Sequence, residues 1–218
     1  MKKILTAVIA LTVSMSAFAQ SSFSIGIGET LRHRVGTDIM ASNTLTQAQS
    51  GLMVEATYGY GFTDNIALTA GLRYSFEGMY NKQVIDLSIL GIKSQSKWLN
   101  GYLELPVNVK FYITPDSACN FFVALGPTLS YWTTNTVKTY AEAGIESTGS
   151  ASYTANMFDT KLYNRFNVGA GLTLGMDIIS HIRVTLGYDF FFLNANNKET
   201  SSYNLKNGQG RLGVAYIF

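Results

Sequence analysis

Eight stretches of the chain alternate between apolar residues and small or polar residues, and this period of two constrains the fold more than any other feature. From residue 52 to residue 62, the even positions hold leucine, valine, alanine, tyrosine and phenylalanine. The odd positions between them hold methionine, glutamate, threonine and glycine. Residues 66–77 repeat the alternation. Because successive side chains of a β-strand point to opposite faces, this pattern predicts strands whose two faces meet different environments.

The alternation predicts eight strands, joined in turn by short and long connections. The expected strands are residues 22–34, 50–62, 66–77, 97–113, 120–132, 161–176, 182–193 and 206–218. Short turns fall at 63–65, 114–119 and 177–181, and longer loops rich in Ser, Thr and Asn fall at 35–49, 78–96, 133–160 and 194–205. A strict alternation of short and long connections along the chain is typical of an antiparallel up-and-down barrel in the outer membrane.

The polar face of these strands is too small and too weakly charged to be the exterior of a soluble protein. Only 14% of residues are charged, against roughly 25% in a typical soluble domain. The other face is continuously apolar, which suits a barrel that is polar inside and apolar outside in lipid. We therefore predict an all-β protein, an eight-stranded antiparallel transmembrane barrel. Alternating pieces at 85–89 and 137–145 leave two alternatives, strands that extend beyond the membrane or a barrel of ten strands.

The first nineteen residues have the features of a secretory signal peptide. Lys2 and Lys3 precede a short apolar stretch, and Ala17-Phe18-Ala19 forms an A-x-A cleavage site. The mature chain, residues 20–218, is then a single outer-membrane domain of 218 − 19 = 199 residues. Removal of two lysines leaves 16 − 2 = 14 basic groups against 14 acidic groups. Zero formal charge argues against a nucleic-acid partner. We expect both termini in the periplasm and the long loops outside the cell.

Outward aromatic residues are expected in two girdles at the membrane boundaries. The periplasmic girdle would contain Phe23, Tyr60, Phe62, Phe111, Phe121, Tyr216 and Phe218, and the outer one Tyr74, Phe76, Tyr131, Phe166, Phe190 and Phe192. Four positions interrupt the pattern. Glu29 has lipid-facing parity, and a bulge at Gly26 or Gly28 would turn it inward. Gly208 and Gly210 leave the last strand without outward bulk, and Pro127 indicates a bulge or a locally unpaired position.

Charged residues on the inward face carry the strongest functional signal. The expected interior network comprises Glu55, Glu104 and Asp189 with Arg73, Arg165 and Arg211. An eight-stranded barrel is just wide enough for side chains to fill its lumen, and buried charges require partners. The network is therefore predicted to be structural and to plug the lumen. The alternative is a narrow gated pore, in which the pairs open to pass ions or small solutes.

The sequence offers little material for catalysis or metal binding. It contains one cysteine, Cys119, in a turn, and two histidines, His33 near the rim and His181 in a turn. A lipid-modifying barrel enzyme would need a Ser, His and acid constellation, and no His-x-Ser pairing occurs. We therefore predict no catalytic residues, no cofactor and no metal site, with a lipid-modifying enzyme as the last alternative.

Two motifs resemble those of known outer-membrane barrels. The C-terminus alternates through Leu212, Val214, Tyr216 and Phe218, and resembles the signal that such barrels present to the barrel assembly machinery. Residues 102–112, YLELPVNVKFY, resemble a strand of the PorT-like outer-membrane β-barrel domain family of Gram-negative bacteria. The resemblance implies an eight-stranded barrel like OmpA and OmpX, without implying one function. We expect a structural or surface-interaction role, with membrane lipid and the assembly machinery as partners and a surface ligand or envelope protein at the four long loops.

Overall fold

A computed structural model of the chain describes residues 21–35, 48–78, 82–87, 92–115, 117–143, 149–156, 163–195 and 206–218. All of the secondary-structure elements in these described residues are β-strands. The described residues include no helix long and apolar enough to cross a membrane. The predicted signal peptide, residues 1–19, lies outside the described residues.

Ten strands form, and eight of them correspond to the predicted ones. They are β1 (Ser21–Val35), β2 (Gln49–Gly61), β3 (Ile66–Glu77), β4 (Lys82–Leu87), β5 (Ile92–Tyr112), β6 (Cys119–Ala143), β7 (Gly149–Asn156), β8 (Phe166–Ile178), β9 (Ile182–Phe191) and β10 (Lys206–Ile217). Three predicted ends were wrong by five residues or more. β5 begins at residue 92 instead of 97, β6 ends at 143 instead of 132, and β8 begins at 166 instead of 161.

Eight of the strands close into a barrel, which confirms the predicted fold class. Around the barrel the order is β5-β3-β2-β1-β10-β9-β8-β6, and β5 pairs with β6 to complete the ring. The neighbouring strands are antiparallel, including the pair formed by the first strand, β1, and the last, β10. Because the ring is closed, each wall strand has a partner on both sides, and the backbone hydrogen bonds of the wall are made between neighbouring strands except at local gaps near Pro106 and Pro127.

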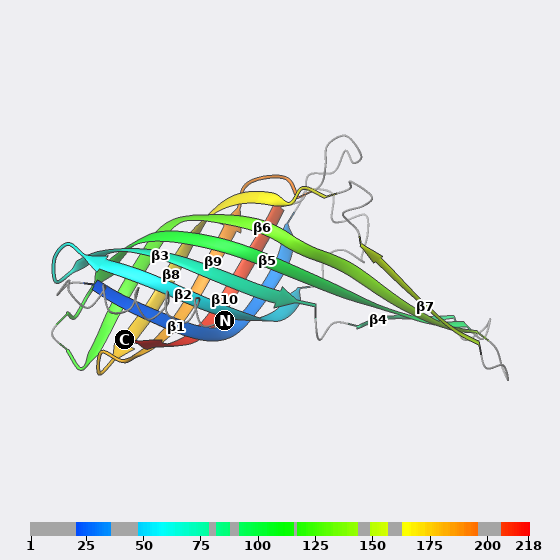
Figure 1. Cartoon of the computed structure of the whole chain (residues 1–218), viewed down its shortest axis with the longest axis horizontal. Helices are drawn as coiled ribbons and strands as arrows, with labels where there is room; N and C mark the ends of the chain where they lie inside the picture. The colour runs from blue at the N-terminus through cyan, green and yellow to red at the C-terminus, as the bar shows by residue number, and fades with distance from the viewer. Residues whose placement is uncertain are drawn as a thin grey trace, which may run out of the picture.

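One side of the wall continues beyond the barrel as a four-stranded sheet. β5 and β6 stay paired out to Ile92 and Ala143, β4 pairs with the outer part of β5, and β7 with the outer part of β6. Figure 1 shows this extension projecting from one end of the barrel. Much of the expected loops 78–96 and 133–160 is therefore strand. The described parts of the two alternating pieces, residues 85–87 and 137–143, lengthen the sheet instead of adding strands to the barrel.

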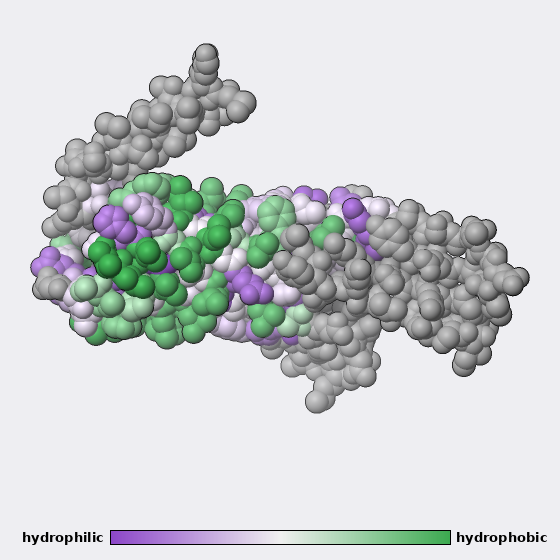
Figure 2. All heavy atoms as spheres, turned by 90° about the horizontal axis from the view of Figure 1, so that it is seen from below, coloured by the Kyte–Doolittle hydropathy of each residue, from purple (hydrophilic) through white to green (hydrophobic). Residues whose placement is uncertain are grey.

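The outer face of the barrel is apolar, as the alternation predicts. Aliphatic residues on it remain exposed, for example Ile27 at 68%, Leu186 at 59% and Leu212 at 54%. Figure 2 shows hydrophobic side chains covering much of the barrel wall. Most of the predicted girdle residues are exposed there, namely Tyr60, Phe62, Phe76, Phe111, Phe121, Tyr131, Phe166, Phe192, Tyr216 and Phe218. In water this surface would favour aggregation, whereas in lipid it is the solvated face.

The two predicted strand irregularities had different outcomes. Between β5 and β6 the ladder is interrupted opposite Gly126 and Pro127, and it resumes in the same register on both sides. The locally unpaired position expected at Pro127 is thus confirmed. The bulge expected at Gly26 or Gly28 was wrong, because β1 keeps an unbroken register with both neighbours. These glycines instead leave room on the inner face, where a Cβ on Gly28 would clash with the Met53 side chain.

Candidate functional site

The polar residues of the alternating strands point into the lumen, and the charged residues among them form two clusters. We call the end of the barrel with the short turns at 62–65, 113–118 and 179–181 the turn end, and the opposite end the extension end. The seven-residue cluster, nearer the extension end, contains Arg32, Glu55, Arg73, Glu77, Glu104, Asp189 and Arg211. The three-residue cluster, nearer the turn end, contains Lys110, Asp177 and Arg183.

Arg73 is the centre of the seven-residue cluster. Its Nε donates to Glu55 Oε2 at 2.6 Å on the neighbouring strand β2. Its Nη1 lies 3.0 Å from Glu104 Oε2 on β5 and 3.0 Å from Asp189 Oδ2 on β9. Since β9 lies across the ring from β3, this single guanidinium bridges the lumen. Only 1% of Arg73 is exposed, so these carboxylates must supply the solvation that water would provide.

Arg32 extends the cluster toward the extension end. Its Nε donates to both oxygens of Glu77, at 2.8 and 2.9 Å, and its Nη2 donates to Glu104 Oε1 at 2.7 Å and Gln209 Oε1 at 2.9 Å. The guanidinium also lies 3.8 Å from the ring centroid of Tyr102, which stacks on Trp132 at 5.3 Å. Cation–π contact with buried rings adds to the ion pairs. An aromatic layer therefore covers the cluster on that side.

Arg211 completes the cluster from β10. Its Nη2 donates to Asp189 Oδ1 at 2.9 Å and to Thr173 Oγ1 at 3.2 Å, and its Nε lies 2.7 Å from Asp189 Oδ2. The local sequence makes room for this side chain. A Cβ on Gly187 would lie 2.7 Å from Arg211 Nη2. Glycines on the inner face thus leave space for the arginines that fill the lumen.

The three-residue cluster is simpler. Arg183 donates from Nε and Nη2 to the two oxygens of Asp177, at 2.7 and 2.9 Å. Lys110 Nζ lies 3.2 Å from Asp177 Oδ2 and 3.6 Å from the ring centroid of Phe122. Taken as fully ionised, the cluster carries two positive charges and one negative charge. The seven-residue cluster carries three positive and four negative charges, so the two clusters together are neutral.

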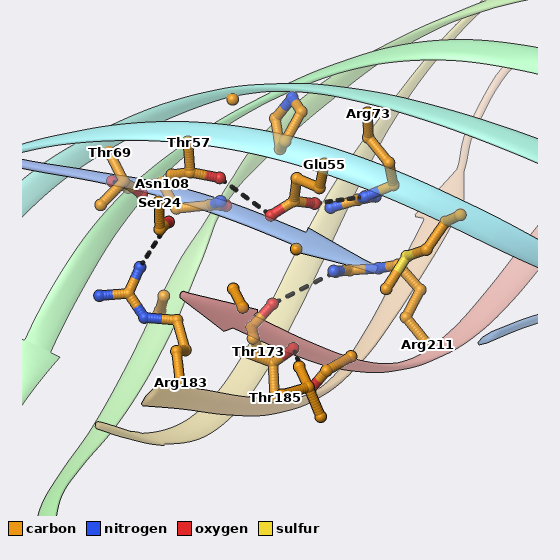
Figure 3. Close-up of a pocket in the computed structure, with 18 of the residues that line it drawn as sticks. Ser24, Glu55, Thr57, Thr69, Arg73, Asn108, Thr173, Arg183, Thr185 and Arg211 are labelled. Carbon is orange, nitrogen blue, oxygen red and sulfur yellow. Dashed lines mark hydrogen bonds and ion pairs between the residues drawn. The ribbon is translucent and has the colours of Figure 1, made fainter. Parts of the chain in front are cut away.

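A cavity of about 60 Å³ separates the two clusters. Glu55, Arg73 and Arg211 line one side of it, and Lys110 and Arg183 line the other, with threonines between. Figure 3 shows Arg183 reaching toward Ser24 from one wall and Arg211 toward Thr173 from another. At roughly 10–15 Å³ per water, the space holds a few water molecules.

The comparison with protein families identifies the kind of barrel. Residues 9–196 match the family described as outer membrane protein beta-barrel domain. The chain belongs to this family. Membership places the protein in the bacterial outer membrane, in agreement with the apolar outer wall. Among curated proteins none matches the chain.

Several solved outer-membrane barrels are similar in structure at low sequence identity. The attachment invasion locus protein Ail of Yersinia pestis is 15% identical, with 91% of this chain and 99% of that chain covered and a TM-score of 0.45. OprG of Pseudomonas aeruginosa is 13% identical, with 92% and 97% covered and a TM-score of 0.49. The outer membrane enzyme PagL is 10% identical, with 90% and 98% covered and a TM-score of 0.37.

Five of the six predicted network residues meet in the lumen of this family member. Glu55, Arg73, Glu104, Asp189 and Arg211 all belong to the seven-residue cluster. The sixth, Arg165, lies elsewhere, because β8 begins one residue after it and Arg165 is exposed on the preceding bend.

Sequence reasoning left five other members of the clusters out of the network. These are Arg32, Glu77, Lys110, Asp177 and Arg183. Four of them have inward parity in the predicted strands, and that parity could have identified them. Asp177 was assigned to a turn.

Other reactive residues lie apart from the lumen clusters. His33 Nε2 lies 3.1 Å from the Tyr188 hydroxyl on the outer wall. His181 Nδ1 lies 2.7 Å from the Ile179 carbonyl in the turn between β8 and β9. Cys119 is a free, exposed thiol at the start of β6. Within the described ranges, no group of three His, Cys, Asp or Glu residues could hold a metal ion. The predicted assembly-signal residues Leu212, Val214, Tyr216 and Phe218 are all exposed along β10 and the residue that follows it.

Proposed function

We propose that this protein is a small structural or surface-interaction barrel of the outer membrane, related to the PorT-like proteins, that performs no catalysis. The observation that carries the proposal is the seven-residue cluster. Arg73 on β3 joins carboxylates from β2, β5 and β9, and Arg32 on β1 joins Glu77 and Glu104 to the same network. Because these side chains bridge the lumen and all of them except Glu55 are almost completely buried, they act as a plug.

The working surface is then the sheet that projects from the extension end. β4, β5, β6 and β7 give this region a fixed backbone on which a ligand or envelope protein could bind. The proposed topology puts the extension outside the cell, the turn end and both termini in the periplasm, and the mature N-terminus at Gln20. Membrane lipid and the barrel assembly machinery are the other partners.

The native cysteine allows a direct test of this orientation. Cys119 is exposed at the turn end, so a membrane-impermeant maleimide added to intact cells should leave it unlabelled. A Cys119→Ser, Thr154→Cys variant moves the thiol to an exposed position on β7 of the extension, and this variant should be labelled. Labelling of Cys119 but not of Cys at position 154 would reverse the orientation.

A narrow gated pore is the second candidate, and the cavity between the clusters favours it. If that water-sized space joined both ends when ion pairs opened, ions could pass. Single-channel conductance of the refolded protein in planar bilayers separates the two functions, with insertion verified by heat-modifiable migration on gels. We expect silent membranes for the wild type and for Arg73→Ala and Glu104→Ala. Steady openings that grow in these variants would establish a pore held shut by the cluster.

Lipid modification has weaker support. His33, the histidine on the outer wall, is hydrogen-bonded to a tyrosine hydroxyl, and we infer that it packs on the barrel surface without activating a nucleophile. Mass spectrometry of lipid A and phospholipids from cells that express the protein is expected to show no new species. A shifted lipid mass that disappears with His33→Ala would overturn the non-catalytic assignment.

A further inference from the structure

Two irregularities of the alternation, an outward carboxylate and an outward glycine, meet on the outer wall of the barrel. Glu29 is exposed on β1 between Ile27 and Leu31, which are 68% and 51% exposed. In the register its neighbours across the strands are Leu52 and Leu212. Among the described residues the Glu29 carboxylate has no hydrogen bond or ion pair. It therefore lies in an apolar surface without an internal partner.

A groove runs over β10 beside this carboxylate. Gly210 pairs with Leu31 on one side and with Tyr188 on the other. A Cβ on Gly210 would meet only one backbone atom within 4 Å, the Leu31 carbonyl oxygen at 3.8 Å. The missing side chain opens a groove of about 600 Å³, whose walls include Glu29, Leu174, Leu186 and Leu212. This volume lies within the range of roughly 300–1,000 Å³ found for small-molecule sites.

Tyr188, one of the residues that line the groove, contacts His33 of β1. The Tyr188 hydroxyl lies 3.1 Å from His33 Nε2, and their ring centroids are 5.8 Å apart. The two rings fill the space above Gly208, where an added Cβ would clash with both. The two outward glycines of β10 thus have different roles, since Gly208 is covered and Gly210 is open.

The charge and the apolar walls of the groove indicate what kind of molecule it binds. A carboxylate on the lipid-facing wall is costly and by default marks a functional position with a partner. An ionised carboxylate only accepts hydrogen bonds, whereas an ammonium group supplies three donors and the opposite charge. We propose that this groove binds an amine-bearing amphiphile, whose hydrocarbon chain lies against the leucines and whose ammonium group pairs with Glu29. The site is independent of whether the lumen conducts.

Dodecylammonium is the probe for this site, with the full-length protein in phosphatidylcholine nanodiscs. Leucine methyl signals are followed by NMR during the titration. We expect saturable shifts at Leu174, Leu186 and Leu212, which line the groove, and none at Leu68 and Leu105 on β3 and β5. Glu29→Gln should weaken apparent binding by about ten-fold or more, in line with the loss of a charge-assisted hydrogen bond. Dodecanol should bind no more tightly to the wild type than to this variant.

A second variant separates the groove from the charge. Gly210→Leu fills the floor and should abolish the saturable shifts, whereas Ala70→Leu, at an exposed position on β3, should leave them unchanged. Heat-modifiable migration establishes that each variant is folded. Equal shifts at all outward leucines would overturn the proposal. So would dodecylammonium binding that survives both Glu29→Gln and Gly210→Leu.

Discussion

The two ionic clusters in the lumen differ in how their charges are shared. In the seven-residue cluster a carboxylate serves two arginines: Glu104 binds Arg32 and Arg73, and Asp189 binds Arg73 and Arg211. In the three-residue cluster one carboxylate, Asp177, holds both cations. The first arrangement is a connected network, and the second is a single centre with two partners.

This difference in connection has an energetic consequence. Removing Arg73 from the connected network takes away the only cation of Glu55 and one of the two cations of Glu104 and of Asp189, and uncompensated buried charge is where the large penalties for buried ion pairs arise. In the smaller cluster the cations repel each other, so loss of one of them relieves repulsion while Asp177 keeps its other partner. The larger cluster should therefore control stability and closure of the lumen, and the smaller one should tolerate change.

The most damaging substitution should be Arg73→Ala. It leaves Glu55 without a cation and leaves Glu104 and Asp189, which are 0% and 1% exposed, with one cation each. We expect the free energy of unfolding to fall by about 3–5 kcal/mol, measured by urea titration in phospholipid vesicles with tryptophan fluorescence. Arg165→Ala, at the exposed rim, is the matched control and should cost less than about 1 kcal/mol. Equal losses in the two variants would contradict a connected network.

Asp177→Asn tests the centre of the smaller cluster. The change leaves Lys110 and Arg183 facing each other without the carboxylate that holds both. The expected loss is about 2–3 kcal/mol, below the value for Arg73→Ala, because Lys110 and Arg183 both line the cavity between the clusters, where water can partly solvate the freed cations. The same urea titration measures it. A loss larger than that of Arg73→Ala would reverse the ranking of the clusters.

Parity alone predicted much of the lumen, and the rest depended on register. The period of two identified the inward faces that carry Arg73, Glu104 and Asp189. It did not show which inward residues lie at the same height along the barrel axis. The stagger between neighbouring strands sets that height, and it cannot be deduced from the sequence of one strand alone. Arg32 lies near the end of β1, yet the register sets it opposite Gln49 and Gln209 and within reach of Glu77.

Asp177 was missed for a local reason. The turn between β8 and β9 is only residues 179–181, and Ile179 and Ser180 adopt left-handed backbone angles, with φ of 49° and 58°. Gly, Asn and Asp are the residues that normally mark such turns. Without one of them, the sequence indicated a longer turn, 177–181, and excluded Asp177 from the strand that presents it to Arg183.

Substitution of the second cation should have a small effect. Lys110→Met keeps an unbranched apolar side chain of similar length and removes one of the two positive charges next to Asp177. The bidentate pair with Arg183 remains, although Lys110 Nζ loses its contact with the Phe122 ring and its hydrogen bond to the Tyr112 hydroxyl at 2.8 Å. We expect a change within about 1 kcal/mol in either direction, because relief of repulsion offsets these lost contacts. A loss of 3 kcal/mol would mean that Lys110 belongs to a connected network as well.

The smallest effect is expected at the polar neighbour of the cluster. Arg183 Nη1 donates to Ser24 Oγ at 3.3 Å, a long hydrogen bond across the cavity wall. Ser24→Ala removes this acceptor while the two bonds from Arg183 to Asp177 remain, so the unfolding free energy should fall by about 0.5 kcal/mol or less. In a Ser24→Ala, Asp177→Asn double variant, Arg183 loses the Ser24 hydroxyl and the charged carboxylate, and the single amide oxygen of residue 177 replaces the two carboxylate oxygens as acceptor. The combined loss should therefore exceed the sum of the single losses. Simple additivity would show that Ser24 does not share Arg183 with the smaller cluster.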